Sequence, residues 1–99
     1  MGLDVGIITI QYLERPHGVA YEFAWELAYE ASANGYMAGE GNNWGTFTQR
    51  QVLRMLDDFA EREGLGSTAK SDILAWVRSL PWDWWNDYHG GIIELHFNW

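Results

Sequence analysis

The stretch HGVAYEFAWELAYEASAN, residues 17–34, decides the fold that we expect for this chain. Glutamate recurs at every fourth position, at Glu22, Glu26 and Glu30, and nearly all other residues are apolar, aromatic or small. This spacing predicts an α-helix, and Gly35 follows it as a stop signal. A surface helix normally buries a much narrower arc, so we expect this helix to be packed on three sides, with only the glutamate stripe in water.

Alanines occupy much of the apolar arc of this predicted helix. Small side chains let a neighbouring backbone approach closely, because the distance between packed elements depends on the side chains at their contact. We therefore expect the helix to lie across a β-sheet, with Ala24 and Ala28 facing it.

Two segments are predicted to be strands of that sheet. Val5–Leu13 is rich in β-branched residues and ends before Pro16, which cannot donate a hydrogen bond to a neighbouring strand. Gly91–Trp99 alternates apolar side chains with mostly polar ones, which is typical of a strand with one buried face.

Two further helices are predicted between these strands. Thr48 and Gln51 form a capping box that opens a helix over Gln49–Glu63, and Gly64 followed by Leu65 is typical of a Schellman stop at its end. The next helix is capped by Ser67 or the residue after it, and it ends before Pro81, which cannot continue a helix.

The remaining segments connect these elements. Tyr36–Thr46 is rich in glycine and asparagine and is predicted to be a loop. Trp82–Tyr88 is predicted to be either a third strand, in a hairpin that sets Asp83 opposite His96, or a short turn or one-turn helix. The predicted fold class is α+β in a single globular domain, residues 1–99: a small antiparallel or mixed sheet of two to three strands packed on three helices, in the order β-α-α-α-β with or without a further strand.

Such a small sheet also bears on the oligomeric state. A two-stranded sheet is marginally stable alone, so either the tryptophan run supplies a third strand or an edge strand pairs with a second chain. We expect a homodimer, formed by edge pairing or by an aromatic patch.

The charge of the chain restricts its partners. Fourteen acidic residues stand against six basic ones, which gives a net charge of −8. This balance disfavours nucleic acid and anionic membranes and favours a basic partner. The sequence contains no cysteine, no signal-peptide pattern and no apolar stretch long enough to span a membrane, so we expect a cytoplasmic protein.

Seven tryptophans in 99 residues exceed what a small core needs, so we expect some of them at a binding surface. At least one indole near Trp44, Trp84 or Trp85 should be exposed, because the adjacent Trp84 and Trp85 point in different directions in an extended run. The candidate aromatic binding residues are Trp44, Trp82, Trp84, Trp85 and Tyr88.

The candidate acidic binding residues are the three glutamates of the stripe, Glu22, Glu26 and Glu30. They could form a ridge for a basic partner, ligands for a hard cation, or simply the solvated face of a buried helix.

The histidines give a weaker pattern. Asp87 lies two residues before His89, and Glu94 lies two residues before His96. A carboxylate can orient an imidazole for catalysis or for a metal, but no third ligand can be placed, so we expect no catalytic residue, cofactor or metal.

These observations favour a non-catalytic protein-binding module that holds a basic partner through aromatic and acidic surface together. By analogy of size and charge alone, acidic inhibitors, antitoxins and immunity proteins are of this kind. The alternative is a small-molecule binder whose Trp- and Tyr-lined pocket takes a sugar, a nucleoside or a cation. An enzyme that uses the two histidines and their neighbouring carboxylates is the third hypothesis.

Overall fold

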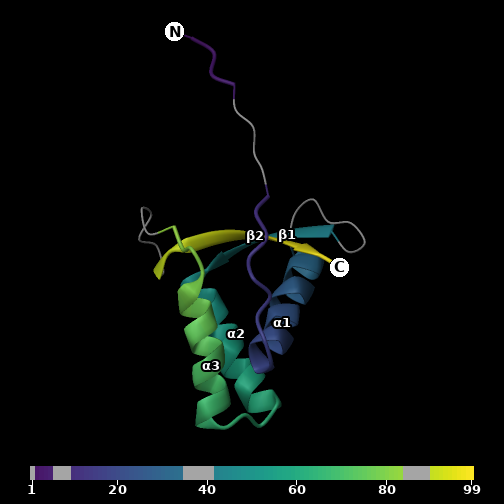
Figure 1. The fold of residues 1–99 in the computed structure, drawn as a ribbon, viewed down its shortest axis with the longest axis vertical. Coiled ribbons are helices and arrows are strands. Elements are labelled where there is room, and N and C mark those ends of the chain that lie inside the picture. Colours follow the sequence, from purple (N-terminus) through teal and green to yellow (C-terminus); the bar gives the residue numbers. More distant parts are fainter. Residues whose placement is uncertain (1, 6–9, 35–41, 84–89) are drawn as a thin grey trace.

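The structure is a computed structural model of the 99-residue chain, and it describes residues 2–5, 10–34, 42–83 and 90–99. Within these residues, two antiparallel strands form a sheet, and the helices extend from one face of it (Figure 1). This is the α+β class predicted from the sequence. The elements, in chain order, are α1 (Val19–Asn34), β1 (Asn42–Thr48), α2 (Gln49–Arg62), α3 (Ser67–Ser79) and β2 (Ile92–Asn98).

The position of the first strand differs from the prediction, although the order of elements roughly matches. Val5 and residues 10–13 lie outside any strand, and residues 6–9 are outside the described part of the chain. β1 instead arises from Asn42–Thr48, most of which was predicted to be a loop. Asparagine and glycine are poor strand formers, but here β2 supplies the pairing that overrides the local preference.

The sheet register divides the side chains between two faces. Phe47 pairs with Ile93 and Gly45 pairs with Leu95, and these residues face the helices. The alternate residues face away from the helices, with Trp44 directly opposite His96. β2 therefore confirms the alternation predicted for the C-terminal segment.

Helix α1 approaches the sheet closely, as its alanines predicted. A Cβ atom added at Gly45 would lie 3.0 Å from the Cβ of Ala31 and 2.7 Å from Cε2 of Phe47, so glycine is required there. Ala28 is buried, whereas Ala24 is only partly buried. The small residues thus set the distance between α1 and β1.

One expectation for α1 was wrong. The helix was expected to expose only its glutamate stripe, but the side chain of Tyr29 is 59% exposed and that of Tyr21 is 38% exposed. The phenol is an amphipathic group whose hydroxyl is satisfied by water, so these rings need no burial on all sides.

The hydrophobic core lies between the helices and the inner face of the sheet. Trp82 belongs to it, because its indole is 5% exposed and its N–H donates to the backbone carbonyl of Val77 at 2.9 Å. The buried apolar side chains of the core are Phe23, Leu27, Ala31, Phe47, Val52, Leu56, Phe59, Ile73, Val77, Leu80, Trp82 and Ile93.

The ends of α2 confirm the local sequence signals. The Oγ1 atom of Thr48 accepts a hydrogen bond from the backbone N–H of Gln51 at 3.1 Å. At the other end Gly64 has a φ of +63°, and the N–H of Leu65 donates to the carbonyl of Ala60 at 2.9 Å. This is the Schellman arrangement predicted for a helix that ends at a glycine.

The segment after α3 does not follow the predicted hairpin register. Asp83 forms an isolated antiparallel bridge with Ile92, whereas the hairpin would have set Asp83 opposite His96. The remainder of that segment, residues 84–88, lies outside the described residues. The helices that are described are too short or too polar to cross a bilayer.

Candidate functional site

Two of the predicted aromatic residues, Trp44 and Trp82, are in the described part of the chain, and they lie in different places. Trp82 is buried in the core with its N–H satisfied, so its ring offers no surface to a partner. Trp84, Trp85 and Tyr88 lie outside the described residues, as do Asp87 and His89. Trp44 is partly buried on the outer face of the sheet.

Trp44 belongs to a small cluster on that outer face. Its ring centroid lies 4.7 Å from that of His96, the residue opposite it in the sheet. The hydroxyl of Tyr12 also contacts this histidine, 3.3 Å from its Nδ1 atom. This contact holds the N-terminal segment against β2.

The structure does not describe a metal site around His96. Glu94, two residues earlier, is exposed on the same outer face. Among the side chains that can be placed, no three His, Asp or Glu residues come together as metal ligands would.

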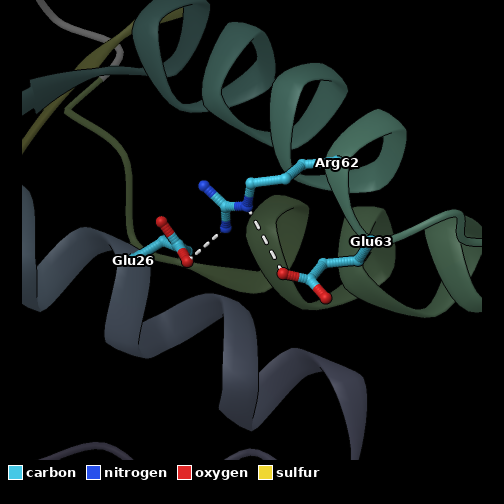
Figure 2. Close-up of polar contacts among 3 residues, drawn as sticks. All are labelled: Glu26, Arg62 and Glu63. Carbon is cyan, nitrogen blue, oxygen red and sulfur yellow. Dashed lines mark hydrogen bonds and ion pairs between the residues drawn. The ribbon is translucent and has the colours of Figure 1, made fainter.

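The three glutamates of the stripe have different surroundings. Glu22 is exposed. Glu30 accepts a hydrogen bond from Nδ2 of Asn34 at 2.9 Å, one helical turn further along. Glu26 forms an ion pair with Arg62 of α2, with 2.5 Å between the carboxylate and the guanidinium (Figure 2).

Arg62 ties α2 to α1 at the middle of the stripe. Its Nη2 atom donates to Glu26, and its Nε donates to Glu63 at 3.3 Å (Figure 2). The hydrogen bond and the charge of Glu26, and then those of Glu63, raise the pKa of Arg62 above its usual range. The guanidinium also lies over the ring of Phe59, 5.4 Å from its centroid. Glu26 is therefore paired with a cation of the chain. Glu22, which is exposed, and Glu30, which is partly buried and bonded to the neutral amide of Asn34, form the acidic surface of α1.

A cluster of aromatic rings lies beside this acidic surface, and we name its four residues the α1 aromatic cluster. Trp25 is at its centre, with ring centroids at 5.4 Å from Trp99, 5.7 Å from Tyr29 and 6.5 Å from Tyr21. Tyr21, Tyr29 and Trp99 are 38%, 59% and 51% exposed. The cluster thus presents a large aromatic surface to solvent.

The aromatic and acidic rows run side by side along α1. Tyr21, Trp25 and Tyr29 repeat every fourth residue, and each glutamate of the stripe follows one of them directly. Residues four apart in a helix are neighbours on one face, so the two rows are adjacent. Both rows can be recognised in the sequence, but the aromatic row was expected to be buried. The contact of Trp99 with this row could not be predicted from the sequence.

One cation of the chain already rests on this cluster. The guanidinium carbon of Arg15 lies 5.8 Å from the centroid of the Tyr21 ring. This is the geometry of a cation–π contact, in which the positive group is attracted to the negative face of the ring.

Two open concavities lie elsewhere on the described surface. One, of about 380 Å³, lies between the N-terminal segment and the end of α3, and Trp76, Leu80 and Pro16 are among its lining residues. The other, of about 290 Å³, lies at the start of α2 beside Arg50 and Arg54. Neither is lined by the α1 aromatic cluster.

Comparisons of the chain with protein-family models, with curated proteins and with solved structures found no match.

Proposed function

We propose that this protein is a non-catalytic binding module that holds a basic segment of a protein partner on the α1 aromatic cluster and the adjacent glutamates. The observation that carries this proposal is the exposure of three rings of one cluster, two of which, Tyr21 and Tyr29, directly precede Glu22 and Glu30 on α1. Tyrosine and tryptophan contribute strongly to binding energy at interfaces, and carboxylates beside them select for positive charge.

The contacts within the chain illustrate the chemistry of this surface. Arg15 lies on the ring of Tyr21, and Arg62 pairs with Glu26. Both rows of the surface therefore accept a guanidinium group already. A partner segment that carries arginine or lysine would make the same two kinds of contact with Tyr29 and Glu30.

The overall charge supports the same partner. A net charge of −8 accelerates encounters with a basic protein and disfavours acidic ones. Small acidic inhibitors, antitoxins and immunity proteins use charge in this way. The small size and negative charge of this chain are the features that support a role of the same kind. The cysteine-free sequence suits a cytoplasmic protein, where disulfides are rare.

A peptide titration tests this proposal. The probe is a synthetic peptide in which arginine alternates with glycine, and binding is followed by NMR of the indole N–H groups. Tyr29→Ser should weaken binding at least about tenfold, as loss of an interface anchor does. The matched control is Tyr12→Ser, which removes an equally exposed tyrosine outside the cluster.

The outcomes separate specific docking from general charge attraction. Equal affinities for Tyr29→Ser and Tyr12→Ser would contradict the proposal, because the peptide would then be held by net charge alone. If methylguanidinium bound at the cluster as tightly as the peptide, the ligand would be a small cation, which is the alternative function. Capture from a cell extract with the original protein and with Tyr29→Ser would then identify the partner.

A further inference from the structure

The N-terminal arm, defined here by its described residues 2–5 and 10–13, is unusually apolar for a surface segment. Leu3 is 88% exposed and Val5 is 86% exposed, and residues 2–5 lie far from the sheet and helices (Figure 1). Ile10 and Leu13 are also about half exposed. Single exposed apolar residues are ordinary, but a succession of them on one segment marks an interaction surface.

The arm also differs from the remainder of the chain in charge. Asp4 is the single charged residue among the first 13, in a chain whose net charge is −8. Two copies of the chain repel each other through their charges, and the repulsion is least where the charges are fewest. The arm is therefore the segment best suited to meet another copy of the same chain.

The sheet supplies a complementary surface. Among the described residues, β1 pairs with β2 and with no other strand, and its other edge makes no backbone hydrogen bond to any of them. On β2, the edge that faces away from β1 is occupied at Ile92, its first residue, by the bridge to Asp83. A two-stranded sheet gains stability from a third strand, and an open edge is a template for one.

Tyr12 fixes where the arm leaves the body of the protein. Its hydroxyl lies 3.3 Å from Nδ1 of His96, on β2. From there the chain continues to residues 2–5, which point away from the molecule (Figure 1).

We propose that the outer part of the N-terminal arm, residues 2–5, pairs as an extra strand with the β1 edge of a second copy of this chain. The second copy returns its own arm to the first, so the contact is two-fold symmetric and closes as a dimer instead of a filament. Backbone hydrogen bonds hold the added strand, and Leu3 and Val5 gain burial. This surface is separate from the α1 aromatic cluster, so a result that contradicts one of the two proposals leaves the other unaffected.

Disulfide trapping tests the pairing, because the chain contains no natural cysteine. Val5→Cys is made in one chain and Thr46→Cys, at an exposed position of β1, in a second chain of different mass. Mild oxidation of the mixture should join the two chains. The matched control replaces Thr46→Cys by Ser71→Cys, at an exposed position on α3.

Mass spectrometry of the trapped species decides the outcome. Equal yields with Thr46→Cys and Ser71→Cys would mean random collision and would overturn the proposal. A single chain that carries both Val5→Cys and Thr46→Cys tests the intramolecular alternative. If it closed its disulfide within one chain at every concentration, the arm would belong to its own sheet and the proposal would fail.

Sedimentation velocity gives the energetic test on the full chain. The variant Leu3→Asp with Val5→Asp should raise the dimer dissociation constant roughly a hundredfold, because two buried side chains are lost from each arm. Tyr29→Ser should leave self-association unchanged. A protein that is monomeric at millimolar concentration would overturn the proposal, and dimerisation lost in Tyr29→Ser but kept in the arm variant would assign the dimer to the aromatic cluster instead.

Discussion

The indole of Trp99 stands edge-on to the indole of Trp25, with 5.4 Å between ring centroids and 64° between ring planes. This contact connects the residue after β2 to the middle of α1, across most of the chain length. Edge-to-face pairs place the positive ring edge of one indole on the negative face of the other. The geometry therefore stabilises the α1 aromatic cluster as well as the end of the sheet.

Trp99→Ala should lower the free energy of unfolding slightly. Trp99 is half exposed, so the loss is chiefly that of the ring pair, about 0.5–1.5 kcal/mol. Urea unfolding measures the change, with Tyr12→Ala as a control ring outside the cluster. A loss as large as that of a core tryptophan would show that Trp99 is buried in solution.

Trp82→Ala should be far more damaging, costing about 3–5 kcal/mol, because it leaves a large cavity in the core. Trp82→Phe keeps most of the apolar volume and removes the indole N–H that donates to Val77. The Val77 carbonyl still accepts a hydrogen bond from the N–H of Leu80, so this variant should lose only about 1 kcal/mol from the missing bond. Equal losses in the two variants would contradict the placement of Trp82.

Gly45→Ala should destabilise the protein by about 1–3 kcal/mol, because its new methyl group has no room between α1 and β1. Part of the conflict is with the Cβ of Ala31, so the double variant with Ala31→Gly should recover part of the loss. A double-mutant cycle in urea measures this coupling. Strict additivity of the two changes would mean that α1 and β1 are not in contact there.

Glu26→Gln should have a small effect that disappears at high salt. The pair with Arg62 is solvent-exposed, and exposed ion pairs contribute little and are screened by ions. Melting temperatures of the original protein and the variant at low and high sodium chloride measure it. The control is Glu22→Gln, since Glu22 lies on the same row, and a salt-independent loss specific to Glu26→Gln would contradict this assignment.

Local sequence signals predicted most of the helices and one strand. The capping pair Thr48 and Gln51, the stop at Gly64 and the alternation of Ile92–Asn98 all depend on neighbours within a few residues. Such signals are readable because the partners of each group lie in the same segment.

The features that were missed depend on distant partners. Asn43 and Gly45 lie in a strand because β2 pairs with them, and the local preferences of these residues do not predict that pairing. The exposure of Tyr29 and the burial of Trp82 depend on which elements happen to cover each ring. The aromatic residues predicted for binding were Trp44 and four residues after α3, whereas the surface that we propose for binding is formed by rings of α1 and by Trp99.

The sheet has a consequence for the speed of folding. Residue 42 pairs with residue 98, and the whole of α2 and α3 lies between the two strands. Closing so long a loop lowers the chain entropy before the strand contacts can stabilise the sheet. Helices α2 and α3 are adjacent in the sequence, so their contact needs only a short loop and forms early. The helical hairpin draws the strand ends together, since Thr48 immediately precedes α2. Changes in the contact between α2 and α3 should accordingly slow refolding, while changes at the far end of the sheet, at Asn98, should mainly hasten unfolding.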